Sequence, residues 1–100
     1  MEKETFNQLI SGQGLVLVDF YATWCGPCQR MHPILDQLKQ QMGDRIRIIK
    51  VDVDEQEALA GKYRIQSVPT LILYKDGVQK WRSSGGMTLT QLKERIETEI

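Results

Sequence analysis

The chain has 100 residues, of which 41% are hydrophobic, and this is enough to build one core without stabilising cross-links. Its 13 basic residues balance its 13 acidic residues, so bulk charge gives no reason to expect nucleic acid or an anionic membrane as a partner. The longest apolar runs, LVLV and LIL, are too short to cross a bilayer. With no internal repeat and no linker-like segment, residues 1–100 are expected to form a single domain.

The first ten residues, MEKETFNQLI, lack the basic start, long apolar stretch and small-residue cleavage site of a secretory signal peptide. This predicts a cytoplasmic location. The alternative that stays open is a mature form from which a leader has been removed.

The first half of the chain is predicted to alternate helix and strand. Residues 4–10 have the apolar spacing of a short helix. Residues 15–22, LVLVDFYA, form an apolar run typical of a strand that is buried on both faces, interrupted only by Asp19. A helix is then expected from Cys25 to Met42, because apolar residues recur there at helical spacing.

The second half predicts two further helices and three strands. Residues 45–54 form a second strand, and residues 55–65 a short helix followed by a loop. Residues 70–82 predict a hairpin, because an Asp-Gly pair separates two strand-like runs. Thr88, with a glutamine three residues later, forms a capping box that begins the last helix. The expected α/β fold is a mixed four-stranded sheet, two parallel strands plus an antiparallel hairpin, with helices on both faces and the strands in the order second, first, third, fourth.

The only two cysteines, Cys25 and Cys28, stand at the start of the predicted long helix. Three residues apart on a helix, their Cα atoms would be about 5 Å apart, within the range that a disulfide accepts. The pair can therefore be bridged or remain as two thiols. Its role could be a structural cross-link, part of a metal site, or a redox pair.

The first two roles have the weaker support. A ring this small restricts the unfolded chain little and would stabilise the fold by about 2 kcal/mol. A metal site would need further ligands, for which His32 and Asp36 have helical spacing, but Pro33 disturbs that register. There is no second cysteine pair to complete a structural zinc site.

The redox role fits the position of the pair. A thiol at a helix N-terminus faces unpaired backbone N–H groups and the positive end of the helix dipole, which both favour the thiolate. The thiolate is the nucleophile in disulfide exchange. Cys25 gains most, while Cys28 lies one turn further into the helix. We therefore expect Cys25 to attack a substrate disulfide and Cys28 to resolve the mixed disulfide.

Several motifs around this pair resemble the thioredoxin family. WCGPC occupies residues 24–28 after the run VDFYAT, Pro33 follows five residues later, and VPT stands at 68–70 before the hairpin. The resemblance covers nearly the whole chain. It implies a thioredoxin fold and a protein-disulfide reductase that cycles between dithiol and disulfide without a bound cofactor. It also implies disulfide-containing client proteins, and electrons from NADPH delivered by a thioredoxin reductase.

The resemblance also implies roles for residues outside the motif. Asp19 corresponds to a buried aspartate that takes the proton of Cys28, a role that suits the raised pKa of a carboxyl group in an apolar strand. Lys50 is expected to be its ion-pair partner on the neighbouring strand, and the alternative is that this pair is only structural. The peptide bond before Pro69 is expected to be cis, which leaves the Val68 backbone free to pair with an extended substrate.

A flat, mostly apolar docking surface is expected around the cysteines, formed by Trp24, Gly26, Pro27, Val68, Pro69, Gly85 and Gly86. For the two late glycines a plain turn before the last helix is an equally open interpretation. Since no other exposed apolar patch is inferred, the chain is expected to be a monomer.

Three features depart from the family pattern. Gln29, followed by Arg30, replaces the usual lysine after the second cysteine, and Ser67 replaces a glycine two residues before the cis-proline. Many family members begin with an additional edge strand, whereas Met1–Glu4 are too few to form one, so no fifth strand is expected.

Two other functions stay open at this point. Disulfide oxidases and isomerases of oxidising compartments share the chemistry, but usually carry a histidine between the cysteines where this chain has Pro27. A non-catalytic binding subunit with the same fold would keep its function without either cysteine.

Overall fold

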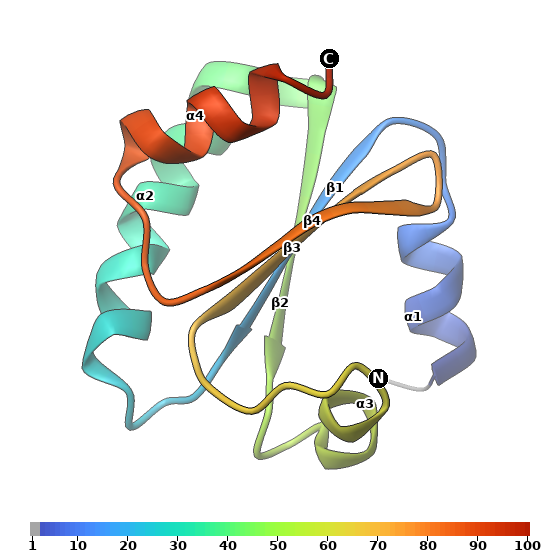
Figure 1. Ribbon diagram of the computed structural model, residues 1–100, viewed down its shortest axis with the longest axis vertical. Helices are drawn as coiled ribbons and strands as arrows, with labels where there is room; N and C mark the ends of the chain where they lie inside the picture. The colour runs from blue at the N-terminus through green and yellow to red at the C-terminus, as the bar shows by residue number, and fades with distance from the viewer. Residues whose placement is uncertain (1–2) are drawn as a thin grey trace.

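The computed structural model describes residues 3–100, and its helices and strands follow the predicted order (Figure 1). The elements are α1 (Lys3–Ile10), β1 (Leu15–Tyr21), α2 (Gly26–Met42), the 3-10 helix η1 (Gly43–Arg45), β2 (Ile46–Asp52), α3 (Glu57–Lys62), β3 (Thr70–Lys75), β4 (Val78–Ser84) and α4 (Leu89–Glu97). The expectation that Met1–Glu4 form no strand falls partly outside the described residues, which exclude Met1 and Glu2, while Lys3 and Glu4 belong to α1.

The strands pair in the order β2-β1-β3-β4, which confirms the predicted topology. β1 and β2 are parallel and are joined by α2, so the connection crosses one face of the sheet. β3 is antiparallel to both β1 and β4. In this register Asp19 of β1 lies between Lys50 of β2 and Leu71 of β3.

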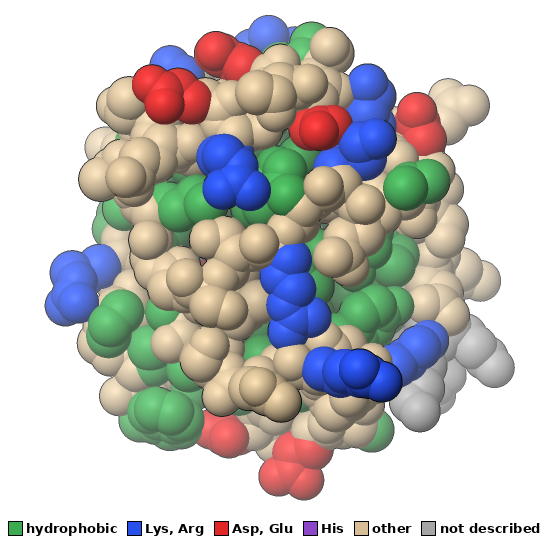
Figure 2. Space-filling model, in the orientation of Figure 1, with side chains coloured by type: hydrophobic (Ala, Val, Ile, Leu, Met, Phe, Trp, Pro, Cys, Tyr) green, Lys and Arg blue, Asp and Glu red, His purple; other side chains and the backbone are tan. Residues whose placement is uncertain are grey.

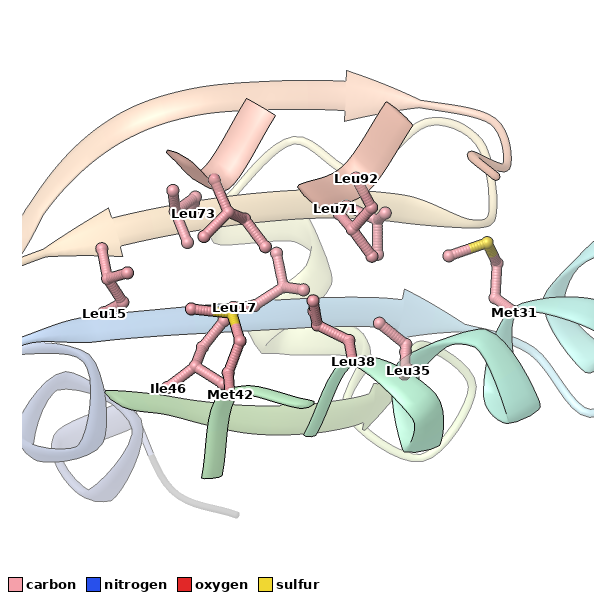
Figure 3. Packing of buried hydrophobic residues seen from close by; sticks show 11 residues of the cluster. Leu15, Leu17, Met31, Leu35, Leu38, Met42, Ile46, Leu71, Leu73 and Leu92 are labelled. Carbon is pink, nitrogen blue, oxygen red and sulfur yellow. The ribbon is translucent and has the colours of Figure 1, made fainter. Parts of the chain in front are cut away.

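The two faces of the sheet bury different halves of β1, because successive side chains of a strand point to opposite faces. Leu15 and Leu17 pack in one core with α2 and α4, as Figure 3 shows. Val16, Val18 and Phe20 pack in the other core with α1 and α3, on the opposite side of the sheet in Figure 1. Because both faces of the sheet are covered, residues 15–20 are all buried. Asp19 is two residues from Leu17 and therefore points to the same face of the sheet, the one covered by α2.

The hairpin turn between β3 and β4 is held by Asp76 and Gly77. Both residues have left-handed φ angles, 51° and 83°, as the tight turns that match strand twist require. The Asp76 carboxylate accepts a hydrogen bond of 2.7 Å from the Gly14 N–H, and the Asp76 N–H donates to the Gly14 carbonyl at 3.0 Å. The turn is thereby attached to the loop that enters β1.

Side chains cap the beginning of α4 and the end of α2. Thr88 accepts from the Gln91 N–H at 3.1 Å while the Gln91 side chain accepts from the Thr88 N–H at 3.0 Å, which is the predicted capping box. At the end of α2, the Lys39 ammonium donates to the carbonyl groups of Gly43 and Ile46 at 2.9 and 2.6 Å. These bonds accompany η1, which the sequence pattern does not predict.

The outer strands of the sheet, as far as residues 3–100 are concerned, are β2 and β4. β2 carries Arg47 and Lys50, and β4 carries Lys80 and Arg82. Figure 2 shows lysine and arginine side chains distributed over the face on which β4 lies. None of the helices in the described part of the chain has the length and apolarity needed to span a membrane.

Candidate functional site

The two cysteines form a disulfide at the start of α2, with a Cα–Cα distance of 5.2 Å. Cys25 is the N-cap residue, and Pro27 in the first turn supplies a helical φ angle where no N–H donor is needed. The Cys28 N–H donates to the Cys25 sulfur at 3.1 Å, so the sulfur takes the place of a capping oxygen. Cys25 is 5% exposed and Cys28 is 0% exposed, so of the two cysteines only Cys25 has any accessible surface.

The loop before β3 packs against this disulfide. The Val68–Pro69 peptide bond is cis. The Val68 side chain packs on the small cluster of Ala22, Cys25 and Cys28, and the Val68 carbonyl oxygen lies 3.7 Å from the Cys25 sulfur. The Thr70 hydroxyl donates to the Ser67 carbonyl at 2.7 Å and closes the loop. The thiol of a reduced Cys25 could therefore donate to Val68, which the disulfide sulfur cannot do.

Gly85 and Gly86 are attached to the same loop. Gly85 has a φ angle of 91°, which favours glycine, and its N–H donates to the Pro69 carbonyl at 2.8 Å. A Cβ atom on Gly86 would lie 3.6 Å from the sulfur of Met31. The interpretation as a plain turn is thus incomplete, because Gly85 bonds directly to Pro69. The sequence pattern identifies Met31 only as a core residue, since its helical spacing carries no sign of this second contact.

Trp24 is the most exposed large side chain at the site, with 72% of its surface accessible. Its indole N–H donates to the Asp54 carboxylate at 2.8 Å, so the ring is fixed although it is exposed. Sequence reasoning missed Asp54, which is 30 residues from Trp24 and reaches it only because β1 and β2 lie side by side. Gly26 and Pro27 are exposed beside Trp24.

The residues that depart from the family pattern have defined positions. The Gln29 side-chain amide donates to the Thr23 carbonyl at 3.1 Å and ties the start of α2 to the loop before it. A guanidinium nitrogen of Arg30 lies 3.8 Å from the place where a Cβ atom of Gly26 would be. Arg30 therefore keeps a positive charge beside Gly26, the first of the two residues between the cysteines.

Asp19 is fully buried, and within the described residues neither of its carboxylate oxygens has a hydrogen-bond partner. Burial raises the pKa of Asp19 to about 6, and the nearby Lys50 ammonium opposes that rise. The expected ion pair with Lys50 does not form as a direct contact. The Lys50 ammonium instead lies 3.9 Å from the carboxylate of Asp36, a neighbour on the exposed side of α2. The Lys50 side chain is 35% exposed, whereas Asp19 is fully buried.

His32 lies one helical turn after Cys28, and its ring stands edge-on to the Tyr21 ring at 5.1 Å. Its Nδ1 atom is buried without a hydrogen-bond partner among residues 3–100. Burial and the charge of Lys50 lower the pKa of His32, while Asp36 raises it. Among the described residues, no group of three or more His, Cys, Asp or Glu side chains comes together in a way that could hold a metal ion.

Known proteins match this chain closely in sequence and in structure. Thioredoxin Y1, chloroplastic, from Arabidopsis thaliana is 43% identical over 99% of this chain and 60% of its own length. Thioredoxin from Bacillus subtilis (strain 168) is 43% identical over 90% of this chain and 86% of its own. The solved structure of a mutant thioredoxin from Halobacterium salinarum NRC-1 superposes with a TM-score of 0.89 at 39% identity, covering 98% of this chain and 85% of that one. The chain spans about three fifths of the chloroplastic relatives it matches.

These relatives contradict the predicted cytoplasmic location, because the chloroplastic thioredoxins Y of Arabidopsis thaliana and Oryza sativa subsp. japonica match nearly the entire chain. The prediction was wrong because it rested on the lack of secretory signal features in residues 1–10, and that lack does not distinguish the cytoplasm from a plastid.

The thioredoxin family model matches residues 1–98, which include the cysteine pair, the cis-proline loop, the sheet and α4. The same region folds as the solved thioredoxin does, with a mixed sheet between two layers of helices. The chain belongs to the thioredoxin family.

Proposed function

We propose that the chain is a thiol–disulfide oxidoreductase that reduces disulfides of client proteins. The observation that carries this proposal is the disulfide between Cys25, at the rim of the site, and the fully buried Cys28, packed against the loop of Pro69. Residues 1–98 match the family model, and the chemistry needs only the sulfur atoms of the chain and the client. We therefore propose that no cofactor is bound.

The first step is an attack by Cys25. In the reduced chain the Cys25 thiolate would accept the Cys28 N–H bond and face the N-terminus of α2, which both stabilise its charge. The thiolate attacks one client sulfur, the client disulfide breaks, and its other sulfur leaves as a thiolate. Cys25 is then joined to the client by a mixed disulfide.

The second step belongs to Cys28 and Asp19. The Asp19 carboxylate, whose pKa is raised to about 6, takes the proton of the Cys28 thiol. The Cys28 thiolate attacks the Cys25 sulfur, the mixed disulfide breaks, and the second client sulfur leaves as a thiolate. The charge of Lys50 favours the ionised form of Asp19 before the proton is transferred.

The client would lie across the exposed surface around the cysteines. The Val68 backbone beside the cis bond is available to pair with an extended segment, and the fixed indole of Trp24 offers an apolar contact. Gly26, Pro27, Gly85 and Gly86 complete this surface, with Gly85 held on Pro69. We propose that the chain acts as a monomeric unit over residues 1–100, reduced by a thioredoxin reductase that draws on NADPH.

Reduction of insulin disulfides in the presence of dithiothreitol tests the function. Wild type should accelerate the reaction, Cys25→Ser should give only the background rate, and Cys28→Ser should accumulate a mixed disulfide with the client. Wild-type turnover from Cys25→Ser would overturn the mechanism. Retention of biological function by the double serine variant would identify a binding subunit instead, and a strongly oxidising equilibrium potential of the 25–28 pair would identify an oxidase.

A further inference from the structure

The outer edge of β2 carries backbone groups that no other strand of the described chain covers. β2 lies at one end of the strand order, with only β1 beside it among residues 3–100. The Val53 N–H donates to the Tyr21 carbonyl at 2.9 Å, so the backbone of Val53 faces β1. Backbone groups of successive residues in a strand point to alternate sides. The even-numbered residues of β2 therefore face away from β1.

Two of these outward-facing groups have partners, and they mark the ends of the open edge. At one end the Ile46 carbonyl accepts from the Lys39 ammonium at 2.6 Å. At the other end the Asp52 carbonyl accepts at 2.9 Å from a backbone N–H of the loop before α3. Between these ends, Ile48 and Lys50 point their N–H and C=O groups outward, where the described chain supplies no strand to pair with them.

A groove of about 410 Å³ lies between this edge and α2. Its apolar part is formed by Leu35, which is buried, and Ile48, which is half-buried. The rest of its lining is charged and consists of Asp36, Lys39, Arg47 and Lys50. A segment extended along β2 would place every second side chain on the side of this groove.

The charges of the groove favour an acidic occupant. Arg47 has no ion-pair or hydrogen-bond partner among residues 3–100. Lys39 donates to backbone carbonyl groups, which do not neutralise its charge. Lys50 lies 3.9 Å from Asp36, but both side chains are exposed enough for solvent to screen the pair. Three positive charges against one negative charge leave the groove basic, so carboxylates of a bound segment would complement it.

The other outer strand, β4, has a less regular edge. Trp81 and Gln79 pair with successive residues of β3, so Lys80 between them is the extra residue of a β-bulge. Such a bulge bends an edge strand and interrupts its ladder. β2 pairs with β1 in continuous register from Ile46 to Asp52. Of the two outer strands, β2 is therefore the one that can accept a regular partner.

We propose that the outer edge of β2 binds an extended acidic segment of a partner protein as an additional strand. The backbone of the segment pairs with Ile48 and Lys50, and this pairing supplies affinity for an extended chain. Its carboxylates meet the basic residues of the groove, and these contacts supply the preference for acidic sequences. No lining residue of the groove belongs to the cluster around the disulfide, so binding does not require the cysteines.

Fluorescence anisotropy with a labelled peptide of alternating valine and glutamate tests the preference for acidic segments. The peptide should bind, whereas a peptide of alternating valine and lysine should not. Arg47→Glu should weaken binding about fivefold at low salt, which corresponds to one exposed charge pair. Lys80→Glu is the matched control, because it makes the same change of charge on β4. Equal weakening by both variants would overturn β2 as the site.

Strand addition itself is tested through backbone groups. Methylation of two adjacent central nitrogens blocks both edges of the peptide without changing its charge, and it should abolish binding. In the free protein the amide hydrogens of Ile48 and Lys50 should exchange fast by NMR, while those of Ile49 and Val51 are protected by β1. The peptide should slow exchange at Ile48 and Lys50 by about tenfold or more. Unchanged exchange at these two residues in the saturated complex would overturn the proposal.

The double variant Cys25→Ser, Cys28→Ser separates this inference from the proposed function. It cannot reduce insulin, but it should bind the acidic peptide as tightly as wild type. Loss of peptide binding by a double variant with the circular dichroism spectrum of wild type would place the peptide at the cysteines and overturn the site on β2.

Discussion

Asp19 and Lys50 are neighbours across two parallel strands, yet the Lys50 ammonium is paired with Asp36, and the Asp19 carboxylate has no direct partner among residues 3–100. A buried carboxylate without a partner destabilises the folded state wherever it is ionised. This free-energy cost is kept at Asp19, the residue that would take the proton of Cys28. Stability and the proposed chemistry therefore make opposite demands on residue 19.

Asp19→Asn should stabilise the protein at neutral pH. The pKa of Asp19 is raised from 3.8 to about 6, so the folded state binds the proton more tightly than the unfolded state. Wild-type stability must then decline as the pH rises through this range, whereas the asparagine variant has nothing to ionise. Urea unfolding should show no difference below about pH 4 and a gain of about 3 kcal/mol for the variant above pH 7. A constant difference across the pH range would contradict this account of Asp19.

Lys50→Gln should raise the pKa of Asp19 further, so that Asp19 becomes available as a base only at a higher pH than in wild type. Removal of the ammonium removes the charge that opposes the raised pKa of Asp19, so the carboxyl group would hold its proton to a higher pH. The rate of the resolving step should therefore begin to fall at a higher pH than in wild type. Lys50→Arg keeps the charge and should behave as wild type. If glutamine and arginine have the same pH profile, Lys50 does not act on Asp19 through its charge.

Gly85→Ala should destabilise the protein through its backbone. The φ angle of 91° is unfavourable for a residue with a Cβ atom, although the surrounding space is open. We expect a loss of about 1 kcal/mol in the free energy of unfolding, measured by urea denaturation. Gly86→Ala is the matched control, because its Cβ atom would meet only an ordinary contact with Met31. Equal losses in both variants would mean that the conformation of Gly85 is not the cause.

Arg82→Lys should loosen the loop that leads to Pro69. The guanidinium of Arg82 donates to the carbonyl groups of Tyr63 and Arg64 at 2.5 and 2.6 Å, which joins β4 to the end of α3. A lysine cannot make both bonds in this geometry, and we expect a loss of about 1 kcal/mol. Hydrogen exchange should be faster in residues 63–66. Lys80→Met breaks only a half-exposed ion pair of 3.9 Å with Glu99 and should change stability by less than about 0.5 kcal/mol.

The fold could be predicted from the sequence because its signals are local. The apolar run of residues 15–22 indicated a strand covered on both faces, and the Asp76-Gly77 pair placed the hairpin turn. The capping box at Thr88 placed the start of α4. These patterns depend on neighbours in the sequence, so no tertiary information was needed.

The site was less predictable wherever it depends on contacts between elements. Asp54 reaches Trp24, and Met31 reaches Gly86, only after the sheet and α2 have assembled. Lys50 was placed on the correct strand, but the direction of its long side chain depends on Asp36 of α2. The location of the protein could not be predicted at all, because the compartment makes no physical demand on this core.

The basic residues on the two outer strands have a consequence for how copies of the chain meet. A strand edge offers unpaired backbone groups that can extend a neighbour's sheet, and repeated extension of this kind leads to fibrous aggregates. Arg47 and Lys50 on one edge, and Lys80 and Arg82 on the other, would bring like charges together in any such contact. This repulsion should keep concentrated solutions of the protein clear at low ionic strength and weaken as salt is added.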